Sequence, residues 1–293
     1  MKLKPLFKWT GGKNKMKAKY GDTFFPDSKY DTFIDCFYGA GAVSHWILEK
    51  KPDTKFIIND HNSEMVKLYK TLRDYPDEFI DASLKLQEGH LSINTIEDRK
   101  AFYNYHKLRH CQEYENLTDI EEAAALYYML RVNFNGWWKI YNYSNGRYAT
   151  PPGTMTEKKP FMDVQNLKNT SKFFKEQCTI LSGDFENVRP YVTDTSYVYF
   201  DPPYRDSTTN YTDDGFNEND QIRLCNFFKE CTQKGALSAL SNKEIGDGFF
   251  ETHLGEYNLH KMEVKYSAGR GDTINKVQEI LVTNFKNIPN TLF

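Results

Sequence analysis

A single stretch, residues 196–204, constrains the fold more than any other part of the chain. Residues 196–200 are rich in aromatic and β-branched side chains, which is typical of a buried strand. The strand must end before Pro202 and Pro203, because neither proline can donate a hydrogen bond to a neighbouring strand. It therefore presents Asp201 and Tyr204 at its carboxyl end, the edge of open α/β sheets where ligands bind. A strand followed by a proline-rich turn with a capping aspartate would give the same pattern.

The bulk composition predicts a soluble globular protein. The chain has 293 residues, with 27% charged and 39% hydrophobic, enough for one large domain or two smaller ones. Its formal net charge of −2 gives no general sign of nucleic-acid binding, and a lysine-rich start usually means only a solvated face. Five scattered cysteines favour reduced thiols and therefore a cytoplasmic location. This would be the bacterial cytoplasm, or the cytoplasm of the host if a phage encodes the protein. We expect no metal, and no membrane partner because no apolar run approaches ~20 residues.

The first part of the chain predicts a cofactor pocket. A strand at 32–36 leads into a loop with Gly39 and Gly41, and a helix follows at 42–50. Strand, glycine loop and helix form the opening of a Rossmann-like cofactor site, although the third glycine of the dinucleotide fingerprint is missing.

A second strand, at 55–60, ends in an acid. Asp60 follows Gly39 by about the ~20 residues expected for an acid that binds ribose hydroxyls. It could also cap the helix predicted at 62–73, and the two roles are compatible.

The middle of the chain, residues 76–170, predicts an inserted helical subdomain, because no β-α alternation is visible there. Asn145-Gly146 lies between aromatic segments, which is a strong hairpin signal. Basic side chains alternate there with aromatic rings, as suits a nucleic-acid ligand, although a hairpin packed on its own domain is the alternative. The predicted helices are 77–86, 97–110 and 119–132.

The alternation of strands and helices resumes near residue 171. We therefore predict an α/β, Rossmann-like sheet divided into residues 1–75, an insertion at 76–170, and residues 171–293. The later elements expected are strands at 178–182, 196–200 and 236–241, a helix at 217–234, and an antiparallel pair at 258–266 and 276–283.

Five motifs, in order and over nearly the whole chain, resemble those of the Dam-type D12 class of DNA adenine-N6 methyltransferases. They are Lys8-Trp9-Thr10-Gly11-Gly12-Lys13, Asp35-Cys36-Phe37-Tyr38-Gly39-Ala40-Gly41, Asn59-Asp60-His61-Asn62, Gly183-Asp184-Phe185 and Asp201-Pro202-Pro203-Tyr204.

This resemblance implies an S-adenosylmethionine-dependent methyltransferase sheet and an inserted, mainly helical target-recognition subdomain that carries a β-hairpin. It implies a cofactor site made of Trp9, Lys13, Asp35, Phe37, Gly39, Gly41, Asp60, Asp184, Phe185 and Asp201. It implies catalysis at Asp201, Pro202, Pro203 and Tyr204, and contacts with double-stranded DNA by Asn135, Trp137, Trp138, Lys139 and Arg147.

The resemblance also assigns roles within the cofactor site. Asp60 would bind the ribose and Asp184 the adenine amine of the donor, while Trp9, Lys13 and the glycine loop would enclose its methionine end. Lys13 could instead cap a backbone carbonyl. Cys36 would be a buried packing residue, since attack by an exocyclic amine needs no nucleophilic thiol.

The chemistry expected at residues 201–204 is polarisation of an amine. Asp201 and the carbonyl of Pro202 would accept hydrogen bonds from the adenine amine and stabilise the positive charge that develops on it. Tyr204 would stack on the base, which must be flipped out of the duplex. Residues 205–216 would order over it, with Tyr211 as one wall, although loop surface is the favoured interpretation of Tyr211.

Two departures from the family pattern put the DNA target in doubt. Trp137-Trp138-Lys139 stands where relatives often have a smaller residue followed by Tyr and Arg, and Pro152 stands where Phe is common. The sequence GATC is a target by analogy only.

Three other functions remain open. They are methylation of an amino group in RNA or protein, a nucleotide-dependent oxidoreductase, and a catalytically inactive DNA-binding protein. The basic-aromatic insertion favours DNA, and the missing third glycine and the double proline disfavour an oxidoreductase. The complete motif at 201–204 disfavours an inactive protein, and the sequence leaves the oligomeric state open.

Overall fold

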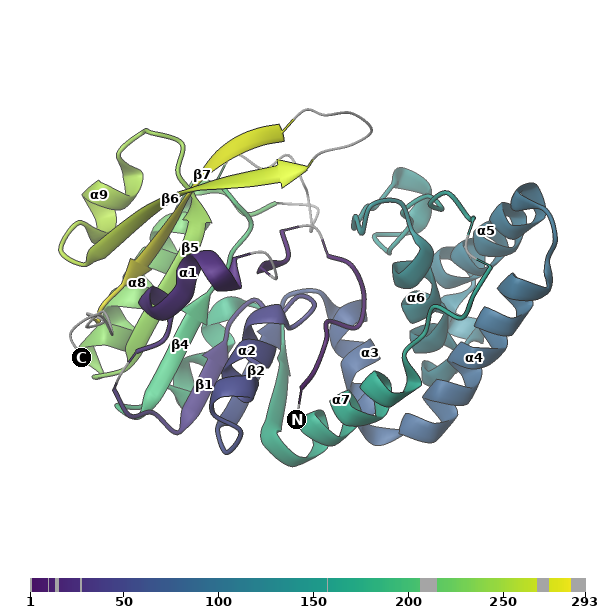
Figure 1. Cartoon of the computed structure of the whole chain (residues 1–293), viewed down its shortest axis with the longest axis horizontal. Coiled ribbons are helices and arrows are strands. Elements are labelled where there is room, and N and C mark those ends of the chain that lie inside the picture. Colours follow the sequence, from purple (N-terminus) through teal and green to yellow (C-terminus); the bar gives the residue numbers. More distant parts are fainter. Residues whose placement is uncertain are drawn as a thin grey trace.

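The computed structural model places an open, twisted sheet beside a group of helices (Figure 1). It describes residues 2–9, 11–13, 16–26, 28–156, 158–205, 215–267 and 274–285. The strands are β1 (Thr32–Asp35), β2 (Lys55–Asp60), β3 (Cys178–Ser182), β4 (Ser196–Phe200), β5 (Leu237–Lys243), β6 (Asn258–Ser267) and β7 (Ile274–Thr283). The α-helices are α1 (Lys17–Phe24), α2 (Ala42–Lys50), α3 (Ser63–Asp74), α4 (Pro76–Ser92), α5 (Ile96–Gln112), α6 (Asp119–Val132), α7 (Val164–Gln177), α8 (Glu218–Gln233) and α9 (Phe249–Leu254).

The sheet has the order β3-β2-β1-β4-β5-β7-β6 within the described residues. The first five strands of this order run parallel, whereas β7 is antiparallel to both β5 and β6. The predicted mixed α/β sheet is therefore confirmed and is consistent with a Rossmann-like methyltransferase fold. The predicted bounds of β2, β3, β4, α2 and α6 agree with the structure.

Side chains alternate between two hydrophobic clusters on the opposite faces of the sheet. In β4, Tyr197 and Tyr199 belong to the cluster shared with α2, α3 and α7, whereas Val198 and Phe200 belong to the cluster shared with α8 and α9. Because every residue of β4 is buried, this strand lies in the centre of the fold. The carboxyl ends of the parallel strands are thereby held at one edge.

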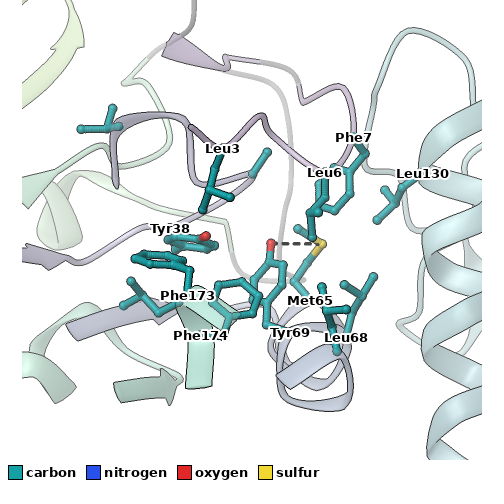
Figure 2. Close-up of a cluster of buried hydrophobic side chains, with 14 of the residues drawn as sticks. Leu3, Leu6, Phe7, Tyr38, Met65, Leu68, Tyr69, Leu130, Phe173 and Phe174 are labelled. Carbon is teal, nitrogen blue, oxygen red and sulfur yellow. Dashed lines mark hydrogen bonds between the residues drawn. The ribbon is translucent and has the colours of Figure 1, made fainter. Parts of the chain in front are cut away.

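The N-terminal segment joins the sheet to the group of helices α4, α5 and α6 (Figure 1). Figure 2 shows Leu6 and Phe7 packed among Met65 of α3 and Leu130 of α6, in the same hydrophobic cluster as Tyr38 of the glycine loop. Arg131 donates a hydrogen bond to the Leu6 carbonyl at 3.0 Å. The group of helices is therefore in direct packing contact with the segment that precedes the predicted cofactor site.

The predicted hairpin around Asn145-Gly146 is only partly present. Asn145 and Gly146 do form a left-handed turn, with φ of 52° and 72°. The described arms nevertheless form no strand ladder. Their regular pairing is one isolated bridge between Asn133 and Pro152. Before the glycine, the chain forms a 3₁₀ turn, η3 (Asn142–Ser144). The ladder is interrupted because the hydroxyl of Thr150 takes the hydrogen bond from the Lys139 amide at 3.0 Å.

Helix α7 was not predicted, and it crosses the expected boundary at residue 170. Its sequence contains Asn, Thr and Ser residues that have low helix propensity. The helix is stabilised by tertiary packing instead, because two of its side chains are fully buried. Phe173 packs on Phe56 of β2, and Phe174 packs on Tyr69 of α3. Two further 3₁₀ turns are η2 (Tyr114–Asn116) and η4 (Phe185–Tyr191), and helices α1 and α9 were likewise not predicted.

Candidate active site

Three acidic residues meet at the carboxyl edge of the sheet. Asp35 ends β1, Asp60 ends β2, and Asp201 directly follows β4. The strand order reverses at β1, which lies between β2 and β4, so the connections leave this edge in opposite directions. Such a reversal opens a crevice for ligands in α/β sheets. The structure therefore brings together the residues that the sequence identified in three separate motifs.

Asp201 is fixed through one of its two carboxylate oxygens. Lys13 Nζ lies 2.7 Å from Oδ1, and the Ser241 hydroxyl donates to the same oxygen at 3.0 Å. The side chain of Asp201 is 20% exposed, and within the described residues Oδ2 receives no hydrogen bond. Oδ2 is therefore the oxygen that remains able to accept a hydrogen bond from a substrate.

Burial and the Lys13 charge act in opposite directions on Asp201. Burial, and to a smaller extent the charge of Glu279, raises the pKa of its carboxyl above the ordinary value, whereas the Lys13 ammonium and the hydrogen bond from Ser241 oppose that rise. Removal of the ammonium would thus favour the neutral acid, which is a weaker hydrogen-bond acceptor.

Lys13 is enclosed beside Asp201, a position the sequence did not indicate. Its side chain is 2% exposed, and its Nζ donates to the Tyr204 hydroxyl at 2.6 Å. Burial alone lowers the pKa of Lys13, but the charge of Asp201, with Tyr20 and Glu279 beyond it, raises the pKa above its ordinary value. Lys13 therefore stays positively charged, and within the described residues it contacts side chains rather than a backbone carbonyl.

Glu279 is a buried carboxylate that the sequence analysis missed. It lies on β7, is 0% exposed, and accepts hydrogen bonds from Tyr204 at 2.7 Å and from Tyr20 at 3.0 Å. The signal was an acid within the apolar run of β7, where burial of an unpaired charge would be very costly. Such an acid has to find partners, and those partners lie in the candidate site.

The loop after Asp201 is held from its other side by α8 and β5. Gln221, which is buried, donates to the carbonyl of Pro203 at 2.9 Å. Its amide oxygen accepts in turn from Asn242 at 3.2 Å. Rigid prolines and this buried amide pair together fix the backbone that follows Asp201.

The glycine loop needs both of its glycines. Gly41 precedes α2 with φ of 76°, and a Cβ on it would lie 2.4 Å from the hydroxyl oxygen of Tyr38. Gly39, with φ of 50°, donates its amide hydrogen to Asp60 Oδ2 at 2.8 Å. Asp60 also accepts from the Asn62 amide at 2.9 Å, and Asn62 itself caps α3. The alternative role of Asp60 as the helix cap is therefore wrong.

Asp35 carries a buried polar atom without a partner. Its side chain is 2% exposed, and Oδ2 accepts from the Ser44 hydroxyl at 2.7 Å, whereas Oδ1 has no hydrogen-bond partner among the described residues. Burial raises the pKa of Asp35 to about 7. An unpaired, buried carboxylate oxygen at this edge is suited to a cationic or hydrogen-bond-donating ligand.

Three phenylalanines form an aromatic cluster beside the glycine loop. Phe37 and Phe185 stack with ring centres 5.6 Å apart, and Phe216 meets both rings edge-on. Asp184 precedes this cluster and pairs with Arg223, whose nitrogen lies 3.0 Å from each carboxylate oxygen. Phe216 was not identified from the sequence, because nothing local marks it as part of the site.

Trp9 connects the glycine loop to the helical group. Its indole nitrogen would lie 3.0 Å from a Cβ on Gly39, so the ring covers that glycine closely. The indole ring also packs against Phe7 and Trp138, with ring centres 6.0 Å and 6.1 Å away. Trp9 therefore lies against the glycine loop, and its contact with a cofactor stays a prediction.

Two of the five predicted DNA contacts are engaged by neighbouring residues of the chain. Trp138 is 4% exposed and packs against Tyr148 with ring centres 4.9 Å apart. Arg147 forms an ion pair with Glu122 and donates to the His110 carbonyl at 2.9 Å. Trp138 is therefore corrected to a packing role, because alternation in the sequence could not tell which face was buried, whereas Arg147 stays a predicted contact that is partly exposed and paired with Glu122.

The other three predicted DNA contacts do reach solvent. Asn135 and Lys139 are exposed, and the Lys139 ammonium lies 4.8 Å from the ring centre of the half-buried Trp137. Tyr141 and Tyr143 follow on the same segment, exposed and stacked on each other with ring centres 5.6 Å apart. Exposed flat rings beside a cation suit stacking on bases and contact with phosphates.

The site fits the expected donor in three places. Asp35 offers the unpaired buried oxygen, Asp60 a carboxylate at the ribose position, and the phenylalanine cluster an apolar surface for a purine. Within the described ranges, no group of three or more His, Cys, Asp or Glu side chains could hold a metal ion. Among those same residues, no helix is long and apolar enough to cross a membrane.

Comparison with known proteins identifies the family. Residues 9–268 match the model of the D12 class N6 adenine-specific DNA methyltransferases. The chain is 32% identical to the type II methyltransferase M.MjaIII of Methanocaldococcus jannaschii, over 97% of this chain and 100% of the relative. It is 31% identical to the type II methyltransferase M1.LlaDCHI of Lactococcus lactis subsp. cremoris, over 97% and 96%. It is 28% identical to M.CviBI of Paramecium bursaria Chlorella virus NC1A, over 95% and 99%.

Proposed function

Because the chain belongs to the D12 class N6 adenine-specific DNA methyltransferase family, it is a site-specific DNA adenine methyltransferase, and we propose that S-adenosylmethionine is its methyl donor. The observation that carries the mechanism is the carboxylate of Asp201, fixed through Oδ1 at the strand reversal with Oδ2 left as an acceptor.

The proposed donor site uses residues on both sides of β1. Asp35 Oδ1 would accept from the amino group of the donor's methionine part, beside Trp9 and the glycine loop. Asp60 would bind the ribose hydroxyls. When bound, the donor supplies an electrophilic methyl group on a positively charged sulfur.

The adenine of the donor would lie against Phe37 and Phe185. Asp184 would accept a hydrogen bond from the amino group of this adenine. To do so, the Asp184 carboxylate would either bind Arg223 and the adenine together or lose its contact with Arg223. This pairing is largely exposed, so its loss costs only about 1 kcal/mol or less.

Asp201 and Pro202 would act on the adenine that is methylated. The amino nitrogen of adenine is a poor nucleophile, because its lone pair is delocalised into the ring. Hydrogen bonds to Asp201 Oδ2 and to the Pro202 carbonyl would draw that nitrogen toward tetrahedral geometry and stabilise its developing positive charge. Pro203 would keep the backbone rigid, and Tyr204 would lie against the base.

The proposed reaction needs no strong general base. The nitrogen that has gained a methyl group is acidic and can lose its proton after transfer. Lys13 would keep Asp201 ionised and oriented rather than move a proton. We therefore assign Lys13 to the catalytic carboxylate in preference to the methionine end of the donor.

The exposed surface of the residue 133–153 segment is the proposed DNA contact. It comprises Asn135, Trp137 and Lys139, to which the stacked pair Tyr141 and Tyr143 is added. The partner is double-stranded DNA with the target adenine flipped out, at a cost of a few kcal/mol.

Two further expectations stay predictions. One is the division of the chain into residues 1–75, an inserted recognition subdomain at 76–170, and residues 171–293. The other is a cytoplasmic location.

The proposal is tested by methyl transfer from labelled S-adenosylmethionine to DNA, RNA and protein, offered separately. We expect label in DNA alone, recovered as N6-methyladenine after digestion. Label in RNA or protein, with none in DNA, would contradict the assignment of the substrate. Sequencing of methylated DNA then gives the target site, for which GATC is only an analogy.

A further inference from the structure

Glu279 is the most deeply buried carboxylate near the reacting groups, and the mechanism above leaves it without a role. It is 0% exposed on β7 and is linked to the site by a chain of hydrogen bonds. Lys13 Nζ donates to the Tyr204 hydroxyl at 2.6 Å, and that hydroxyl donates to Glu279 Oε1 at 2.7 Å. Tyr20 donates to Oε2 at 3.0 Å, so both oxygens are held by phenols.

The charges of this cluster explain why a second carboxylate is useful. Lys13 fixes Asp201, but an ammonium 2.7 Å from the catalytic carboxylate also cancels its charge. The formal charges of Lys13 and Asp201 cancel. Including the carboxylate of Glu279 brings the formal charge of the three side chains to −1. Methyl transfer from a sulfonium develops positive charge on the adenine nitrogen, and a neutral cluster would stabilise that charge poorly.

We propose that Glu279 is a positioning residue of methyl transfer, which offsets the charge of Lys13 and orients Tyr204, so that the site keeps a net negative charge beside the reacting amine. This inference rests on the proposed function. Glu279 acts through Lys13 and Tyr204 and does not touch the substrate.

A double-mutant cycle tests this role. Glu279→Gln keeps the shape and a hydrogen-bond acceptor but removes the charge. We expect kcat to fall about tenfold to hundredfold, while the Kd of S-adenosylmethionine and the KM for DNA stay within about twofold. In a Lys13→Met background there is no cation to offset, and Glu279 would only repel the charge of Asp201. There Glu279→Gln should leave kcat unchanged or raise it.

The sign change between the two backgrounds distinguishes charge from structure. A merely structural role predicts that Glu279→Gln lowers kcat in both backgrounds, because Lys13 and Glu279 share Tyr204 and their losses need not add. A fall of kcat in the Lys13→Met background would therefore overturn the inference, as would a Glu279→Gln enzyme with the kcat of the wild type. If Glu279→Gln alone does not fold, kcat is compared between Lys13→Met and the double variant, in which both opposite charges are removed. A kcat that is unchanged or higher in the double variant supports the inference, and a lower kcat contradicts it. A wild-type enzyme that methylates no DNA would instead refute the proposed function.

Discussion

The three carboxylates at the sheet edge differ because their partners differ. Asp201 has the positive charge of Lys13 beside it, and Asp60 accepts from two backbone amides. Asp35 has only neutral donors, among them the Ser44 hydroxyl, and its Oδ1 has no partner among the described residues. A charged partner stabilises a buried carboxylate more than a neutral donor does. Asp35 is therefore the group whose ionisation should depend most on what occupies the site.

Asp35 predicts a pH-dependent stability. Its folded pKa is about 7 against an ordinary value of 3.8, so between these values the unfolded chain has lost the proton and the folded chain still holds it. Stability should therefore fall as the pH rises through this window. Asp35→Asn removes the effect, and the variant should gain about 2–3 kcal/mol relative to wild type between pH 5 and pH 8.

Chemical denaturation of both proteins at the two pH values measures this gain. The quantity compared is the change in the free energy of unfolding between the two pH values. Any loss of stability that Asp35→Asn causes at both pH values, such as a weaker contact with Ser44, therefore cancels. The same offset at pH 5 and pH 8 would mean that Asp35 ionises normally. We also expect Asp35→Asn to weaken the binding of S-adenosylmethionine, measured by calorimetry.

Among the elements, the glycine loop is the least tolerant of change. Gly41→Ala has to place a Cβ 2.4 Å from the Tyr38 hydroxyl oxygen at φ of 76°. The left-handed backbone costs about 1–2 kcal/mol, and the overlap about 1–3 kcal/mol more. Gly246 is a matched control, because it has φ of 78° and a Cβ added there would meet nothing within 4 Å.

Denaturant unfolding of the two alanine variants separates these effects. Gly246→Ala should lose only the backbone part and keep its affinity for S-adenosylmethionine, whereas Gly41→Ala should lose more stability and bind the donor more weakly. Equal losses in the two variants would show that Tyr38 moves aside without cost.

The residue 133–153 segment predicts a salt-dependent effect of Lys139. Lys139→Ala should raise the KM for DNA and lower the slope of log affinity against log salt by about 1, as expected for the loss of one phosphate contact. Lys55 is the control, an exposed lysine at the start of β2 and so at the opposite edge of the sheet. An equal change in slope for Lys55→Ala would place the DNA elsewhere.

Local sequence signals predicted the elements whose pattern and packing agree. β2 and β4 are apolar strands stopped by an acid or by prolines, and α6 begins with a capping box at Thr118. Helix α7 and the hairpin were predicted poorly, because Phe173 in one and Thr150 in the other act through tertiary contacts.

The same limit applies to the candidate site. Motifs identified Asp35, Asp60 and Asp201, since each follows or ends a recognisable strand. The partners that set their charge could not be found in this way. Lys13 and Glu279 are 266 residues apart in number, and only the fold places both around Tyr204.

For the whole molecule, the N-terminal segment connects the parts that methylation requires. Lys13 pairs with Asp201, the proposed catalytic carboxylate, and Trp9 covers the glycine loop. The backbone of Lys8 lies so close to Gly136 that a Cβ on that glycine would meet the Lys8 carbonyl oxygen at 2.8 Å. The proposed DNA segment, donor loop and catalytic edge thus share one short stretch of chain, which offers a direct route for coupling DNA binding to catalysis.

The measurement that tests the account most directly is a single-turnover methyl transfer by wild type and Asp201→Ala on the same DNA. Donor and DNA affinities are measured on both proteins in parallel. We expect Asp201→Ala to bind both ligands but to transfer methyl groups at least about a hundredfold more slowly. A variant that transfers at the wild-type rate would contradict the central role of this carboxylate.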